Sequence, residues 1–115
     1  LRKWIKALKS GKYTQTKLRL KSESGYCCLG VLCDLIGDRE WKGGKYRLKD
    51  GKFEQIYSYG TGSNAYLPRR FQKELGINRR EQEELSNIND NSNDFKKVIE
   101  KLNEYLNSAM DRGAS

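Results

Sequence analysis

The sequence predicts one α+β domain spanning residues 1–115, in which a small antiparallel sheet of about four strands is packed by a buried central helix and a long C-terminal amphipathic helix. Residues 28–36 are apolar on nearly every side, which is typical of a buried helix. Residues 13–20, before that run, alternate with a period of two, and residues 45–48 and 53–59, after it, resemble strands. A single apolar stripe at helical spacing follows near the C-terminal end. This length suffices for one modest core.

A short amphipathic helix is expected at the start of the chain. Its apolar residues fall at helical spacing, and they are Leu1, Trp4, Ile5 and Leu8. Ser10 and Gly11 are a plausible helix end, because glycine readily adopts the left-handed conformation. Residues 13–20 then alternate with a period of two, which predicts a strand. Residues 21–25 form a polar turn in this interpretation, and the next strand returns antiparallel from Tyr26.

Residues 25–37 contain all three cysteines and the most apolar run of the chain. Within them, residues 28–36 predict the buried helix, which Gly37 ends. Gly30 is expected to let another backbone approach closely, because it lacks a Cβ atom. Asp34 is the one polar residue inside the run, so we expect it to cap a backbone group or pair with a nearby cation.

The second half of the sequence predicts a hairpin followed by three helices. Residues 45–48 and 53–59 resemble strands, and Asp50-Gly51 between them is a strong tight-turn signal. Residues 60–64 are expected to form a flexible loop. Pro68 fits the first position of a helix that Gly76 closes.

Asn78 and Glu81 have the spacing of an N-terminal capping pair for a charged helix that runs to about residue 85. A polar loop is expected over residues 87–93. The long terminal helix follows, and Ser92 or Asn93 can cap it. Its apolar stripe consists of Phe95, Val98, Ile99, Leu102, Tyr105, Leu106 and Ala109.

The formal net charge of +8 is unevenly distributed along the sequence. Residues 1–25 carry eight Lys/Arg and one acid, residues 26–60 carry six and five, and residues 61–115 carry nine and nine. The excess therefore lies in the first quarter of the chain. Such an asymmetry favours a basic face that meets an anion, and a solvated face that aids solubility remains the alternative.

Several kinds of chemistry are disfavoured by the composition. The chain has no histidine, which excludes Ser-His and Cys-His pairs and histidine-ligated metals. The adjacent Cys27 and Cys28, with Cys33, suit a buried apolar role in a reducing cytosol better than disulfides or zinc. We therefore predict no catalytic residue, no metal and no cofactor, although a cysteine nucleophile near the helix start stays open. No stretch approaches the roughly 20 apolar residues that span a bilayer, and no signal peptide is visible.

Two groups of residues are candidates for ligand binding. The face of the predicted strand over residues 13–20 mixes an aromatic ring, an amide and two cations, as phosphate- and base-binding surfaces do, and as solvent-exposed strand faces also do. The Gly-Thr-Gly-Ser-Asn loop over residues 60–64 could offer backbone N–H groups to a phosphate, with tyrosines and arginines close by. The candidates are Tyr13, Gln15, Lys17, Arg19, Tyr57, Tyr59, Gly60, Gly62, Tyr66, Arg69 and Arg70. Whether the two groups form one site is left open.

Two stretches carry a resemblance to a known family. Residues 4–13 (WIKALKSGKY) with Gln15, and residues 27–35 (CCLGVLCDL), resemble a family of small proteins encoded by bacteriophages and prophages. Shorter matches extend the resemblance over most of the chain, and they are Leu67-Pro68, Leu85 with Ile88-Asn89-Asp90, and Phe95 with Ile99 and Leu102. The resemblance implies a viral origin, activity in the cytoplasm of the infected host, and no catalytic residues to carry over.

These observations predict a non-enzymatic binding protein that acts in the infected cell. The expected activity is counter-defence through an anionic ligand such as a nucleotide signal. One alternative is an inhibitor that binds nucleic acid or a host protein, and another is a nucleotide-handling enzyme that uses a cysteine or Asp34. No membrane partner is expected, and a homo-oligomer with its pocket between subunits is possible.

Overall fold

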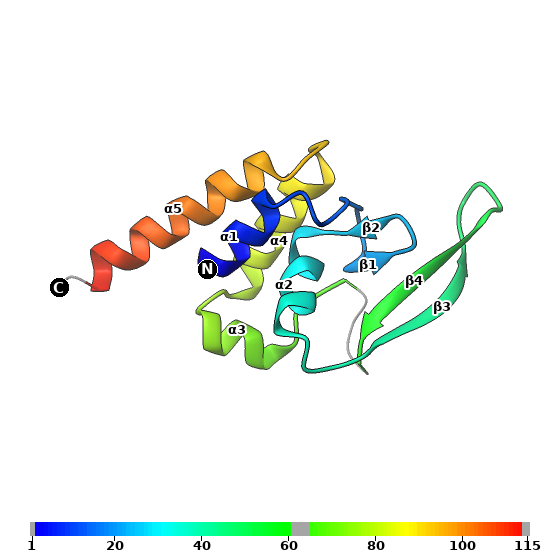
Figure 1. The fold of residues 1–115 in the computed structure, drawn as a ribbon, viewed down its shortest axis with the longest axis horizontal. Coiled ribbons are helices and arrows are strands. Elements are labelled where there is room, and N and C mark those ends of the chain that lie inside the picture. Colours follow the sequence, from blue (N-terminus) through cyan, green and yellow to red (C-terminus); the bar gives the residue numbers. More distant parts are fainter. Residues whose placement is uncertain (1, 61–64, 114–115) are drawn as a thin grey trace.

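The computed structural model describes residues 2–60 and 65–113, with side chains described as far as residue 107. The described residues form five helices and a four-stranded sheet, which confirms the α+β prediction (Figure 1). The elements in chain order are α1 (Arg2–Lys9), β1 (Lys21–Ser22), β2 (Gly25–Tyr26), α2 (Cys28–Ile36), β3 (Trp41–Arg47), β4 (Phe53–Tyr59), α3 (Arg69–Leu75), α4 (Arg79–Asp90) and α5 (Lys96–Gly113). Among the described residues, no helix combines the length and apolar character needed to cross a membrane.

The helices form a body around α2. Helices α1 and α4 pack against α2, while α5 packs mainly on α1 and α4 and extends away from the sheet (Figure 1). The long terminal helix therefore covers other helices, where the sequence had suggested that it covers the sheet. Trp4 of α1 is buried and donates its indole N–H to the Cys28 carbonyl over 2.8 Å. This bond fixes α1 to the start of α2.

Helix α2 has the predicted bounds, and its two ends explain them. The Cys27 side chain precedes the helix and accepts a hydrogen bond from the Gly30 amide over 3.4 Å, and Gly37 ends it in the left-handed conformation at φ 61°. A Cβ atom on Gly30 would lie 1.8 Å from the Leu20 carbonyl oxygen, so the predicted close backbone approach is confirmed. The last turn differs from the prediction of full burial, because Leu35 and Ile36 are about 40% exposed.

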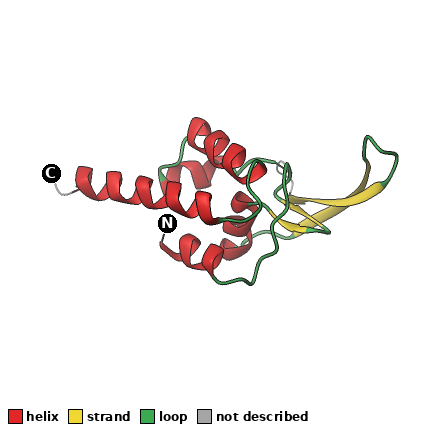
Figure 2. Cartoon of the chain, turned by 90° about the horizontal axis from the view of Figure 1, so that it is seen from above, coloured by secondary structure: helices red, strands yellow, loops and turns green. Residues whose placement is uncertain are grey.

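The sheet has the order β2-β1-β4-β3 with antiparallel neighbours throughout. Strands β3 and β4 pair along their whole length from Trp41 opposite Tyr59 to Arg47 opposite Phe53. The hairpin was predicted, but β3 begins at Trp41 and is longer than expected. We call residues 41–59, with their connecting turn, the ribbon. It projects from the helical body at the end of the molecule opposite the tip of α5 (Figures 1 and 2).

Residues 13–20 do not form the predicted strand. Their one ladder contact is an isolated parallel bridge between Gln15 and Tyr26, and Leu18 adopts a left-handed conformation at φ 70°. Side-chain bonds from α4 hold the segment instead. The Asn89 amide donates to the Thr16 carbonyl over 2.9 Å, and the Leu18 N–H donates to an Asp90 carboxylate oxygen over 3.0 Å. The strands lie in residues 21–26, where the sequence suggested a turn before Tyr26.

The C-terminal helices differ from the predictions mainly at their ends. Pro68 stands immediately before α3, one position earlier than predicted, and Gly76 closes α3 at φ 69°. The predicted Asn78–Glu81 capping box is present at the start of α4. Helix α4 runs on to Asp90, so the loop predicted from residue 87 begins later. Asp94 accepts from the Lys96 amide over 3.0 Å at the start of α5, in the role proposed for Ser92 or Asn93.

Candidate functional site

The three thiols are buried, and they lack the exposure that a nucleophile needs. Burial raises the pKa of Cys27 to about 11, although Cys27 caps the N-terminus of α2. Burial likewise raises the pKa of Cys33 to about 12 and that of Cys28 well above its ordinary value. The thiols are therefore held in the protonated form at neutral pH. Within residues 2–60 and 65–107, no group of three potential metal ligands is assembled.

Asp34 accepts hydrogen bonds from two aromatic side chains. The Tyr13 hydroxyl donates to one carboxylate oxygen over 2.7 Å, and the Trp41 indole N–H donates to the other over 3.2 Å. These neutral donors take the place of the cap or cation that the sequence suggested. Burial, followed by the bond to Asp34, raises the pKa of Tyr13 to about 12. Asp34 thus joins the segment after α1 to the start of β3.

The first predicted group of ligand-binding residues is dispersed by the absence of a strand. Tyr13 bonds to Asp34, and Gln15 donates its amide to the carbonyl and side-chain oxygens of Asn89 over 3.0 and 3.2 Å. Lys17 is exposed, whereas Arg19 is half-buried and donates to the Leu18 carbonyl over 3.2 Å. Tyr13 and Gln15 therefore have structural roles, and ligand binding by Lys17 or Arg19 stays a prediction.

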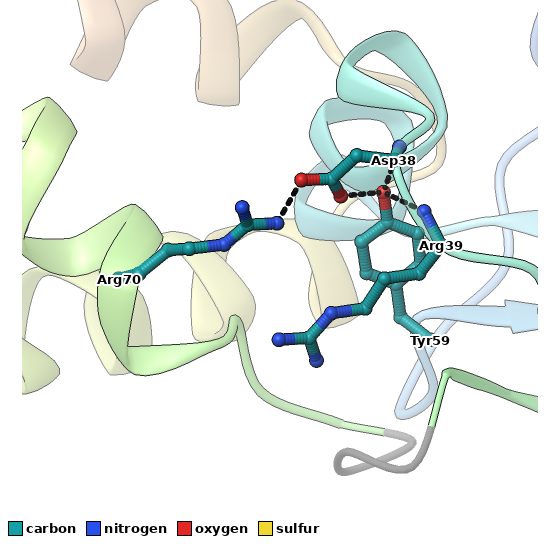
Figure 3. A network of polar contacts seen from close by, with 4 residues as sticks. All are labelled: Asp38, Arg39, Tyr59 and Arg70. Atoms are coloured by element: carbon teal, nitrogen blue, oxygen red, sulfur yellow. Dashed lines mark hydrogen bonds and ion pairs between the residues drawn. The ribbon is translucent and has the colours of Figure 1, made fainter.

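The second predicted group is partly engaged in the network of Figure 3. The Tyr59 ring is buried, and its hydroxyl donates to Asp38 over 2.7 Å while accepting from the backbone N–H groups of Asp38 and Arg39. Arg70 forms an ion pair with the same carboxylate. The Tyr59 bond and then the Arg70 bond lower the pKa of Asp38. This network fixes β4 and α3 to the segment before β3.

The remaining predicted residues lie in different places. Gly60 has φ 63° and packs its backbone against Arg39, so it serves the turn after β4. Arg69 is exposed and lines an open groove on α3 together with Arg70. Tyr57 lies in the ribbon, and Gly62 falls outside the described residues. The structure therefore does not bring the ten described candidates into one site.

One member of each group does meet in a pocket of about 330 Å³ between the segment before β1 and α4. Arg19 and Tyr66 both line this pocket, and the Arg19 Nε atom is buried without a hydrogen-bond partner among the described residues. The Arg79 guanidinium lies 3.8 Å from the Tyr66 ring centroid. Glu83 and Asp90 line the same pocket, so it is mixed in charge rather than basic.

The ribbon is an exposed basic surface that lies apart from the cations of α1. Its five cations are Lys42, Lys45, Arg47, Lys49 and Lys52, and all five are exposed. Its two acids are Asp50 and Glu54, which leaves a net charge of five minus two, or +3, on residues 41–59. None of the five cations forms an ion pair with any residue in the described part of the chain. Their charges are therefore available to a partner.

The strand register divides the ribbon into two faces. Side chains alternate along a strand, so Tyr57 shares its face with Trp41 and the buried Tyr59 toward the helical body. The outer part of the same face consists of Tyr57, Lys45, Arg47, Phe53 and Gln55. We call these five residues the platform face. Lys42, Tyr46 and Glu54 point to the opposite face. Phe53 is 65% exposed at the outer end of the platform face.

The inner end of the platform face is bordered by an aromatic cluster around Lys21 of β1. The Lys21 ammonium lies 4.8 Å from the Tyr57 ring centroid, 5.1 Å from that of Tyr26 and 5.3 Å from that of Trp41. A polar cleft of about 310 Å³ opens beside it and is also lined by Lys12. The cation-bearing surface thus continues from the ribbon to β1.

Residues 1–106 match a family described as "Domain of unknown function (DUF8296)". The chain belongs to the DUF8296 family. No curated protein and no solved structure matches it.

Sequence reasoning missed the ribbon as a basic surface of this DUF8296 chain. Counting charge over residues 26–60 gave six cations and five acids, because the window included acids near the base of the ribbon. Two of these are engaged there, Asp34 by aromatic donors and Asp38 by Tyr59 and Arg70. A narrower window over residues 42–52 contains five cations and one acid, a local excess that the wider count concealed.

Proposed function

We propose that this chain is a non-enzymatic binding protein whose ribbon contacts the phosphate backbone of a nucleic acid. The observation that carries the proposal is the ribbon itself, a projecting two-stranded element with five exposed cations and no ion pairs to the described residues. Lysine and arginine contacts to phosphate supply most of the non-specific affinity of proteins for nucleic acids. A projecting ribbon can reach along a backbone without obstruction by the helical body.

The exposed aromatic residues favour this function over a role in solubility alone. Solubility alone requires charge and does not require an exposed ring. Phe53 is nevertheless 65% exposed beside Arg47. Cations interleaved with exposed rings are typical of surfaces that hold nucleic acids. The charge also favours a polyanion over a single small anion, because the cations extend along the whole ribbon rather than converging on one point.

The state of the cysteines and of Asp34 supports a protein without catalysis. The thiols are buried with raised pKa values, and Asp34 accepts from Tyr13 and Trp41. An enzyme that used either group would need to release it from these contacts. The bacteriophage resemblance supports a setting in an infected bacterial cell, where a nucleic-acid-binding protein could oppose a host defence.

A second candidate is the binding of a small nucleotide in the pocket that Arg19 and Tyr66 share. The buried Arg19 Nε donor without a described partner is the observation that favours it, because such donors are usually satisfied. A base could stack on Tyr66 and its phosphate could accept from Arg19. Thermal-shift measurements with nucleotides and cyclic dinucleotides test this candidate. A stabilisation that Arg19→Met abolishes would support it, and the absence of any shift would contradict it.

Fluorescence anisotropy with a labelled oligonucleotide of about 20 nucleotides tests the main proposal, in salt rising from about 50 to 200 mM. We expect saturable binding at low salt that weakens as salt rises, because bound cations release counterions from the phosphates. Failure to bind either a single strand or a duplex at low salt would contradict the proposal and would leave a small nucleotide or a host protein as the partner.

A further inference from the structure

We infer that the platform face binds single-stranded nucleic acid by base stacking, in preference to a duplex. This inference rests on the proposed function and specifies its ligand. It names the side chains that contact bases, where the proposed function requires only contacts to phosphate. The surface consists of Lys45, Arg47, Phe53, Gln55 and Tyr57, with Lys21 of β1 beside Tyr57.

Two aromatic rings and two cations share this one face. Phe53 and Tyr57 lie on β4, four residues apart, and Arg47 stands opposite Phe53 in the register. Four residues of strand span about 13 Å at 3.3–3.4 Å per residue. Bases stacked in a helix are about 3.4 Å apart along the strand, so the two rings would hold bases that are not stacked neighbours. The face therefore fits a splayed strand better than a stacked one.

A duplex could not use these rings. Its bases are stacked on one another and present only their edges in the grooves, so an aromatic side chain finds no free base face. A single strand offers that face at every nucleotide, and each base stacked on an aromatic side chain contributes substantially to binding. Phe53 is 65% exposed, and its ring can stack on a base of a single strand but finds no such base face in a duplex.

The centre of the platform face is shaped to keep polar atoms available between the rings. Gly43 lies opposite Tyr57, and a Cβ atom there would be 2.2 Å from the Gln55 amide nitrogen and 2.9 Å from the Tyr57 ring. The missing side chain thus lets Gln55 and Tyr57 lie across β3. Gln55 can donate to and accept from a base edge, while Lys45 opposite it and Arg47 farther out on β3 contact phosphates.

The opposite face provides a matched control within the same ribbon. Tyr46 is 47% exposed there and shares its face with Lys42 and the acid Glu54. Phe53→Leu and Tyr46→Leu each remove one exposed ring at unchanged net charge. Substitutions at such exposed positions leave the fold intact, which a thermal melt of each variant checks.

The experiment measures the affinity of wild type and of both variants at one salt concentration. The ligands are a DNA single strand, an RNA single strand and a duplex of equal length. Wild type should bind at least one of the two single strands more tightly than the duplex. Phe53→Leu should weaken single-strand binding about 5- to 150-fold, the range expected for one lost stack, and leave duplex binding within about 2-fold. Tyr46→Leu should leave both affinities within about 2-fold of wild type.

Equal or tighter binding of the duplex would overturn the inference and leave the proposed function standing. Two further results would overturn the inference, because neither identifies stacking on the platform face. In the first, Phe53→Leu weakens single-strand and duplex binding equally. In the second, Tyr46→Leu weakens single-strand binding as much as Phe53→Leu does. Binding of no nucleic acid at all would refute the proposed function together with the inference.

Discussion

At the scale of single residues, Asn89 organises the segment that the sequence presented as a strand. Its side chain, on α4, is fully buried and bonds to that segment and to the start of α2. The side-chain oxygen accepts from the Cys28 N–H over 3.3 Å and from the Gln15 amide over 3.2 Å. The side-chain nitrogen donates to the Thr16 carbonyl over 2.9 Å. One amide thus satisfies polar groups that lie far apart in the sequence.

Asn89→Ala should therefore reduce the free energy of unfolding by roughly 2–4 kcal/mol, because it leaves several buried donors and acceptors without a partner. Urea denaturation measures the change. Asn87→Ala provides the control, since Asn87 is exposed on the same helix and bonds to Asn91 through its carbonyl group. The control should change stability by less than about 0.5 kcal/mol. Comparable small losses in both variants would contradict the role given to Asn89.

At the scale of elements, the fold depends on the close approach of α2 to the segment before β1. Gly30→Ala would place a Cβ atom 1.8 Å from the Leu20 carbonyl oxygen, which is too short for any contact. Backbone atoms cannot rotate away, so the helix or the segment must shift. We expect a loss of about 3 kcal/mol, or failure to fold, measured by urea denaturation or circular dichroism.

Gly44→Ala is the matched test of that packing. Its added Cβ atom would meet a Tyr46 ring carbon at an ordinary 3.5 Å, in an extended strand that accepts alanine. Its stability should stay within about 0.5 kcal/mol of wild type. If Gly30→Ala proved as stable as Gly44→Ala, the approach of α2 to Leu20 would be wrong.

Elements with strong local signals could be predicted from the sequence. The bounds of α2 follow from an apolar run that Gly37 ends, and the hairpin follows from Asp50-Gly51. Residues 13–20 could not be predicted, because alternation favours a strand while the conformation depends on bonds to α4. Leu18 illustrates this, since its unusual φ of 70° goes with an N–H bond to Asp90, 72 positions away.

At the scale of the whole molecule, buried thiols and tyrosines make stability sensitive to alkaline pH. Burial raises the pKa of Cys27 to about 11, of Cys33 to about 12 and of Tyr13 to about 12, from ordinary values of 9.0 and 10.0. A group with a raised pKa stabilises the fold fully below its ordinary pKa, and this contribution is lost as pH rises through the folded value. The free energy of unfolding should therefore fall between about pH 9 and 12.

Tyr13→Phe separates one contribution to this decline. The variant loses the bond to Asp34 and should be less stable than wild type at neutral pH. The difference should narrow above about pH 10, because Tyr13 ionises in unfolded wild type and phenylalanine cannot ionise. Urea denaturation across this range measures both proteins. A difference that stays constant to pH 12 would contradict the pKa assigned to Tyr13.

The sequence predicted the kinds of residue in the candidate site but not its position in the fold. Tyrosines, cations and an anionic partner were expected, and Tyr57 lies on the platform face. The position was missed, because the charge counts placed the excess in residues 1–25. Those cations lie partly on α1, where Lys6 and Lys9 are exposed, and partly beside the ribbon, where Lys21 is set among aromatic rings. Which cations share a surface depends on the topology, and charge counts along the chain do not contain that information.

The most direct test of nucleic-acid binding by the ribbon compares two variants of equal net charge. Lys45→Gln with Arg47→Gln removes two ribbon cations, and Lys6→Gln with Lys9→Gln removes two from α1, so each pair lowers the formal charge from +8 to +6. Affinity for one oligonucleotide is measured by anisotropy across the same salt range. The ribbon variant should bind more weakly and lose about 1.4 from the slope of log affinity against log salt, at about 0.7 per single-strand contact. The α1 variant should keep the wild-type slope. Equal losses of affinity and slope in both variants would contradict binding by the ribbon, and so would a loss in the α1 variant alone.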